Sequence, residues 1–192
     1  VLLTALVVAG GGPISADSLI EAIWGNDPPR SALGTLQTYV SRLRRSLPER
    51  GVPMIELEPG GYCMDLAGHR VDVELFDRLA DDGARLLEDD RPAEARDVLD
   101  QALSLWRGPP LLDLVDRPHG VAQAANLEER RLVVLEQRIA ADLQLGRHAG
   151  VVAELQTLVD EHPLRERTQE MLALALYRSG RQAEALRALS AA

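Results

Sequence analysis

Two segments of the chain match one another at an offset of 34 residues, and this repetition limits the possible folds more than any other feature. One segment, LGRHAGVVAEL, begins at Leu145, and the other, SGRQAEALRAL, begins at Ser179. A third copy, DRPAEARDVLDQAL, begins at Asp90 and falls outside this period. In each copy a turn with arginine is followed at the same offset by an alanine: Ala93, Ala149 or Ala183. Self-similarity at such a period is typical of stacked pairs of helices.

The segment 71–192 is therefore predicted to be a tetratricopeptide-like helical repeat domain. Aromatic residues make up only 3% of the chain, so its core must consist mainly of leucine, valine and alanine, which suits packed helices. Pro163 closes one of the repeat units, and the last helix is expected to be cut short. The expected helices are 71–90, 91–106, 121–145, 148–163, 164–180 and 181–192, with the longest break at 107–120.

The segment 1–66 has a different pattern, in which short helices precede a hairpin. Glycine, proline and capping residues divide it into three expected helices. Alternating apolar and polar residues around Pro59-Gly60-Gly61 predict a hairpin. The expected elements are a helix over 1–9, a second helix after Ser15 that ends at Gly25, a third helix after Ser31 that Pro48 ends, and a hairpin over 54–66.

The third helix of this segment has one apolar and one polar face. Apolar side chains recur at a spacing of three and four residues, which places them on one side of a helix. The opposite side carries hydroxyl and guanidinium groups. The apolar face comprises Leu33, Leu36, Val40, Leu43 and Leu47, and the polar face comprises Thr38, Ser41, Arg42 and Arg45, flanked by Thr35, Gln37 and Arg44.

This polar face forms a local basic island in an acidic chain of net charge −9. The stretch from Arg30 to Arg50 contains five arginines and one acidic residue. Arginine can pair bidentately with guanine, and glutamine and threonine can meet other base edges or phosphates. Two preceding helices and a following hairpin complete the order of a winged helix-turn-helix. An arginine-rich face is also compatible with simple solvation, so both interpretations stay open on this pattern alone.

Longer motifs resemble a known family over nearly the whole chain. The stretch LIEAIWGNDPPRSALGTLQTYVSRLRRSL, with the later GGY, resembles the DNA-binding domain of the Streptomyces antibiotic regulatory protein family, an OmpR-type winged helix. The segments LWRGP, HPLRER and YRSGRQAEAL resemble its bacterial transcriptional activator domain. The resemblance implies a mostly α-helical protein with a winged helix at 1–66, beginning at the first helix without the N-terminal strands, and an activator domain at 71–192.

The resemblance also implies a function and a set of contacts. It implies an activator of secondary-metabolite genes that is cytoplasmic and nucleoid-associated. Its partners would be double-stranded promoter DNA with direct repeats, RNA polymerase, and a second copy of itself on repeated half-sites. Base contacts are expected from Thr38 and Arg42, backbone contacts from Thr35, Gln37, Tyr39, Ser41, Arg44 and Arg45, and wing contacts from Gly60, Gly61 and Tyr62.

Some residues depart from the family pattern. Cys63 stands where the family usually has arginine after Gly-Tyr, and Glu56 and Glu58 place two carboxylates on the first wing strand. An alternative interpretation is therefore a helical-repeat interaction module whose winged helix no longer binds DNA.

Other classes of protein find little support in the sequence. The single cysteine excludes an internal disulfide, and no histidine stands at metal-ligand spacing from it. There is no phosphate-binding loop and no nucleophile motif, so neither an enzyme nor a cofactor is expected. The apolar run at 1–9 is too short to span a bilayer, so no membrane association is expected.

Overall fold

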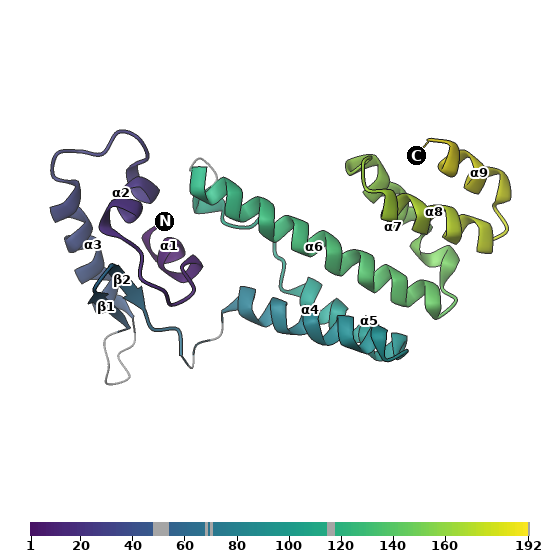
Figure 1. The fold of residues 1–192 in the computed structure, drawn as a ribbon, viewed down its shortest axis with the longest axis horizontal. Helices are drawn as coiled ribbons and strands as arrows, with labels where there is room; N and C mark the ends of the chain where they lie inside the picture. Colours follow the sequence, from purple (N-terminus) through teal and green to yellow (C-terminus); the bar gives the residue numbers. More distant parts are fainter. Residues whose placement is uncertain (48–53, 68, 70, 115–117, 192) are drawn as a thin grey trace. The chain divides into compact units, whose positions relative to one another are not determined.

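The computed structural model describes residues 1–47, 54–67, 69, 71–114 and 118–191, so that Pro48 and Arg50 lie outside the described residues. The chain is mostly helical (Figure 1). Its contacts divide it into two compact units. The first unit comprises Val1–Glu74 with Gly108–Glu129, and the second comprises Leu75–Arg107 with Arg130–Ala192. The segment from Gly108 to Glu129 thus groups with the winged helix, although its sequence lies within the expected second domain.

The first unit contains three short helices and a hairpin in the predicted order. The side chain of Ser15 caps α2, because its Oγ accepts a hydrogen bond from the backbone N–H of Ser18 at 3.0 Å. Ser31 precedes α3 but makes no side-chain capping bond, contrary to the prediction. The elements are α1 (Leu2–Val8), α2 (Ala16–Trp24), α3 (Ala32–Ser46), β1 (Ile55–Glu58), β2 (Gly61–Met64), the short 3-10 helix η1 (Leu112–Leu114) and the start of α6 (Pro118–Gln144).

The hairpin gains a third partner from the loop before α2. β1 and β2 are antiparallel, with Ile55 opposite Met64. Ile14 and Tyr62 exchange two backbone hydrogen bonds of 2.9 and 2.8 Å. β2 therefore lies between Ile14 and β1, and β1 is the edge strand.

The core of the first unit joins all three helices to the hairpin. The buried side of α3 starts at Ala32, whereas Leu33 is 52% exposed. The expectation that Leu33 belongs to the apolar face is wrong, because the helix turns Ala32 and not Leu33 toward the core. The most deeply buried side chains of this core are Leu6, Leu19, Leu36, Val40 and Ile55.

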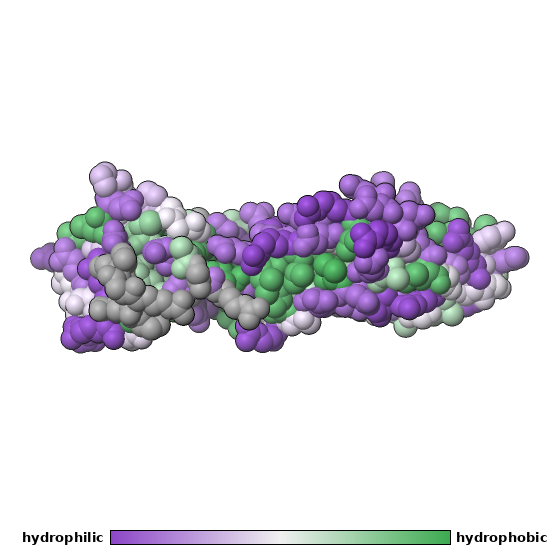
Figure 2. All heavy atoms as spheres, turned by 90° about the horizontal axis from the view of Figure 1, so that it is seen from below, coloured by the Kyte–Doolittle hydropathy of each residue, from purple (hydrophilic) through white to green (hydrophobic). Residues whose placement is uncertain are grey.

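The second unit is built from antiparallel helices. Its strongest packing joins α7 to α8 and α8 to α9, around a core that includes Leu155, Leu172 and Ala175. The face drawn in Figure 2 is mostly hydrophilic and is interrupted by apolar patches. Besides the continuation of α6, the helices are α4 (Asp72–Glu88, which begins in the first unit), α5 (Pro92–Ser104), α7 (His148–Glu161), α8 (Glu166–Arg178) and α9 (Gln182–Ala191).

The three repeated turns have the same backbone geometry. Asp90, Gly146 and Gly180 have φ values of 57°, 76° and 79°, the left-handed conformation that commonly ends a helix. The following arginine N–H donates back to a carbonyl five residues earlier, at 2.9 Å in every case. These bonds join Arg91 to Leu86, Arg147 to Asp142 and Arg181 to Leu176. The off-period copy at Asp90 is thus the same structural motif, made without glycine.

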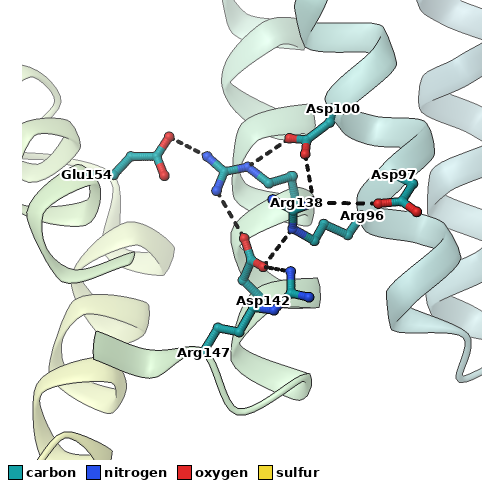
Figure 3. Close-up of polar contacts among 7 residues, drawn as sticks. All are labelled: Arg96, Asp97, Asp100, Arg138, Asp142, Arg147 and Glu154. Atoms are coloured by element: carbon teal, nitrogen blue, oxygen red, sulfur yellow. Dashed lines mark hydrogen bonds and ion pairs between the residues drawn. The ribbon is translucent and has the colours of Figure 1, made fainter. Parts of the chain in front are cut away.

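A buried carboxylate on α6 ties three elements together (Figure 3). Asp142 accepts hydrogen bonds from Arg96 on α5 at 2.9 Å, from Arg138 at 3.1 Å and from Arg147 at 3.1 Å. Arg138 also pairs with Glu154 on α7. The network therefore links α5, α6, the α6–α7 turn and α7 through two buried charged groups, Asp142 and Arg138, and three more exposed partners.

A second buried carboxylate on α6 faces α8. Glu136 accepts hydrogen bonds from Arg165 at 2.9 Å and from Thr168 at 2.8 Å. Burial by itself would raise the pKa of Glu136, but these two hydrogen bonds and the charges of Arg165 and Arg167 outweigh burial and lower the pKa. The carboxylate is therefore held in its charged form where α6 meets the start of α8.

Candidate nucleic-acid interface

The outer side of α3 presents a continuous polar surface, because the opposite side is fixed in the core. Leu36 and Val40 are buried, and they orient the helix. The structure brings the predicted polar residues together on the solvent side. Of the predicted contact residues, Gln37, Thr38, Tyr39, Ser41, Arg42 and Arg45 are exposed, and Thr35 and Arg44 are half-buried.

Arg42 lies at the centre of this surface. Among the residues that the structure describes, none forms a hydrogen bond or an ion pair with its guanidinium. Its neighbour Arg45 instead donates from Nε to the carbonyl of Ser41, one turn back, at 3.3 Å. The full set of Arg42 donors is thus available for a planar, bidentate acceptor such as the edge of guanine.

The threonine hydroxyls of α3 are turned back onto the helix. Thr35 Oγ1 donates to the carbonyl of Ser31, and Thr38 Oγ1 donates to that of Gly34, each at 3.0 Å. Each hydroxyl oxygen still has lone pairs that can accept a hydrogen bond from outside. Without a change of rotamer, these two residues can therefore present acceptors and a methyl group to a ligand.

Arg44 differs from the other arginines of the island. Its Nε donates to the backbone carbonyl of Ile55 at 2.8 Å, in a half-buried position. The sequence places Arg44 on the flank of the polar face, where it was expected to approach phosphates. The structure shows that one of its N–H groups is used inside the protein, between α3 and the hairpin.

The turn of the hairpin has a backbone that suits glycine. Gly60 and Gly61 have φ values of 115° and 144°. A Cβ on Gly61 would stand 2.0 Å from the carbonyl oxygen of Ile14, so only glycine fits beside this loop. The side chain of Tyr62 is buried in the core, at 6% exposure. The expected wing contact of Tyr62 is therefore corrected: its ring supports the hairpin from within, and only Gly60 and Gly61 stay candidates for contact.

Tyr39 is held by an aromatic partner from α2. Its ring stacks on Trp24, with centroids 6.0 Å apart and an interplanar angle of 17°. Tyr39 is nevertheless 39% exposed. This stack joins α2 to α3 through one aromatic pair.

The side chains of the hairpin strands include two carboxylates on β1 and a thiol on β2, and none of these three carries a positive charge. Cys63 Sγ donates to the carbonyl of Gly11 at 2.7 Å. Burial, followed by the negative charges of Glu58, Asp65 and Glu56, raises the pKa of the Cys63 thiol, so the neutral thiol is favoured. A neutral group thus occupies the position where the family usually has arginine.

The exposed leucines and the Arg44 contact were not predicted. Leu57 lies on the edge strand and is exposed, although its alternation with Ile55 predicts a shared buried face. The alternation was the only signal in the sequence, and it fails although Tyr62, the cross-strand partner of Leu57, is buried. Among the described residues no helix is long and apolar enough to cross a bilayer, and no cluster of histidine, cysteine or acidic side chains in them could hold a metal ion.

Comparison with known proteins matches both parts of the chain. The family model of the bacterial transcriptional activator domain matches residues 71–192. The model of the C-terminal domain of transcriptional regulatory proteins matches residues 1–64.

Several regulators are similar over almost the whole chain. The regulatory protein AfsR of Streptomyces griseus is 43% identical over 96% of this chain, which corresponds to 19% of that protein. The regulatory protein DnrI of Streptomyces peucetius is 39% identical over 95% of this chain and 70% of that protein. A solved structure of Mycobacterium tuberculosis EmbR in complex with a low affinity phosphopeptide has a TM-score of 0.89 and 31% identity, and covers 99% of this chain and 52% of that chain. The chain spans about a fifth of AfsR.

These relatives are named as regulators, not as enzymes, and the fold agrees with them: a winged helix is followed by tetratricopeptide-like helices. The chain therefore belongs to the bacterial transcriptional activator domain family, as a transcriptional regulator of the Streptomyces antibiotic regulatory protein type.

Proposed function

We propose that the chain activates transcription by binding direct repeats in promoter DNA, with α3 in the major groove and the hairpin turn along the neighbouring minor groove. One observation carries this proposal. Arg42 is exposed and unpaired among the described residues, at the centre of a polar surface whose opposite side is fixed by Leu36 and Val40. An unpaired arginine on a helix whose orientation is fixed is suited to reading guanine.

The remaining polar side chains of α3 have a second role in this proposal. Thr38 reads a base beside the one that Arg42 reads, while Thr35, Gln37, Tyr39, Ser41 and Arg45 position the helix on the backbone. Because Arg42 is assigned to a base, few arginines of α3 are left for phosphates, and a single subunit makes few phosphate contacts. Useful affinity then comes from two subunits on repeated half-sites.

The helical segment 71–192 supplies protein contacts in the same proposal. Stacked helix pairs present an extended surface, which is the usual binding surface of such repeats. The segment would contact RNA polymerase at promoters of secondary-metabolite genes. Support comes from the two Streptomyces relatives, which are regulatory proteins.

The test begins with selection of duplexes from a random pool by the wild-type chain, followed by affinity measurements on the enriched duplex and on unrelated DNA. Arg42→Ala should weaken binding to the enriched duplex by about tenfold or more, since one bidentate guanine contact contributes about 1–3 kcal/mol of discrimination. Binding to unrelated DNA should change little. Gln37→Ala, which changes a proposed backbone contact on the flank of the same helix, is the comparison and should weaken both kinds of DNA alike.

Two results would refute the proposal. If selection enriches no sequence at low salt, the chain does not read DNA, and the interaction-module interpretation replaces it. If Arg42→Ala weakens both kinds of DNA equally at one salt concentration, Arg42 does not read a base.

A further inference from the structure

The edge strand β1 has a backbone carbonyl, that of Ile55, which β2 does not bond and to which α3 supplies a donor. The N–H of Asp65 donates to the carbonyl of Met54 at 2.8 Å. In an antiparallel pair this bond makes Ile55 and Met64 a pair without mutual hydrogen bonds. The carbonyl of Ile55 therefore points away from β2, toward the open edge of the sheet. Arg44 supplies the donor for it, at 2.8 Å from Nε.

This contact joins the two parts of the proposed interface. α3 carries the base-reading residues, and β1 leads directly into the turn at Gly60 and Gly61. The other side of the hairpin is fixed by the Ile14–Tyr62 bridge. On the side of the edge strand, it is the side chain of Arg44 that ties α3 to the hairpin among the described residues.

We infer that Arg44 is a positioning residue: its Nε–H sets the hairpin turn relative to α3, and this hydrogen bond, rather than a phosphate contact, is how Arg44 supports DNA binding. The inference rests on the proposed DNA-binding function. It corrects the role expected for Arg44 from its place on the helix, and it removes one arginine from the count of phosphate contacts.

Glutamine and methionine separate the two roles, because of the atoms they share with arginine. Glutamine, like arginine, has an N–H donor after three side-chain carbon atoms, so Arg44→Gln keeps the donor and removes the charge. Arg44→Met has a similar length and lacks both donor and charge. If Arg44 contacts a phosphate, both variants lose that contact equally.

The experiment is a salt titration of binding to the selected duplex by wild type, Arg44→Gln, Arg44→Met and the control Arg45→Gln. We expect Arg44→Gln to bind within about twofold of wild type and Arg44→Met to bind about tenfold more weakly, as for the loss of a hydrogen bond to a charged donor. Both should keep the wild-type slope of log affinity against log salt. Arg45→Gln should make that slope shallower by about 0.9, the change for one phosphate contact.

Hydrogen–deuterium exchange on the free protein supplies a second measurement that needs no DNA. Exchange at the hairpin amides should be faster in Arg44→Met and unchanged in Arg44→Gln, while exchange in α2 stays at the wild-type level in both. Equal losses of affinity in the two Arg44 variants, with slopes shallower by about 0.9, would overturn the inference and assign Arg44 to a phosphate. Absence of specific binding by the wild-type chain would instead refute the proposed function.

Discussion

Replacing the buried carboxylate of Asp142 by an amide should weaken the second unit more than any change of an exposed charge. The Asp142 side chain is 6% exposed and accepts hydrogen bonds from three arginines (Figure 3). Arg138 is the most buried of these donors, at 11% exposure, and Arg147 is the least, at 54%. Asp142→Asn keeps the shape of the side chain, but it replaces one accepting oxygen by an NH2 donor and leaves Arg138 with only its pairing to Glu154 of the two close carboxylates.

The magnitude follows from the exposure of each donor. A hydrogen bond to a charged group contributes about 1.5–3 kcal/mol when it is protected from water, and this applies to Arg138. Arg96 is partly screened and adds about 1 kcal/mol, and the exposed Arg147 adds a few tenths. We therefore expect Asp142→Asn to lower the free energy of unfolding by about 3 kcal/mol, at the lower end of the range for a broken buried ion pair.

Urea unfolding followed by circular dichroism measures this loss. The matched control is Asp97→Asn, because Asp97 pairs with Arg96 at 3.5 Å but is 74% exposed. That variant should lose less than about 0.5 kcal/mol. A loss below about 1 kcal/mol for Asp142→Asn, or one equal to that of the control, would refute the view that this network holds α5, α6 and α7 together.

Three further substitutions test the second unit. Folding lowers the pKa of Glu136, so the charged carboxylate stabilises the fold above its unfolded pKa of about 4.3, and this stabilisation is lost as pH falls through the lower folded value. Glu136→Gln should therefore reduce the urea midpoint at pH 7 and flatten the decline of the midpoint between about pH 5 and pH 3. A decline as steep as that of the wild type would contradict this. Asp90→Gly should raise the free energy of unfolding by about 0.5–1 kcal/mol, because the left-handed φ of 57° at Asp90 suits glycine better. Gly146→Ala, at a matching turn with open space around its Cα, should lower it by a similar amount.

The order of helices could be predicted because local signals agree with the tertiary fold. Glycine and proline end the helices, and the repeated turns place Asp90 where Gly146 and Gly180 stand in the other copies. The grouping of Gly108–Glu129 with the first unit could not be predicted. It depends on contacts between distant segments, such as the 3.3 Å hydrogen bond from the Thr4 hydroxyl to Asp113, for which periodicity gives no signal.

The polar face of α3 shows which features of a candidate binding site helical periodicity can predict. Periodicity gives the direction of each side chain around the helix axis, so it correctly turned Arg42 outward and Leu36 inward. Periodicity does not say which part of the helix surface another element covers. Leu33 and Arg44, the two residues whose surroundings differ from the prediction, lie at the borders of the buried part. Leu33 is 52% exposed at the start of α3, whereas Arg44 donates a hydrogen bond to β1.

The number of arginines in the basic island is larger than the number that are free to contact phosphates. The sequence counts charges, whereas affinity for a phosphate backbone depends on charges whose donors are free to reach it. Arg42 has no described partner, Arg45 folds back along its own helix, and Arg44 donates to the edge of the hairpin. Three adjacent arginines thus have three different surroundings, because the backbone of a neighbouring strand offers one of them a buried acceptor that no linear pattern reveals. The basic island is therefore partly a structural connection within the winged helix, and only the remainder is available for the DNA contacts that we propose.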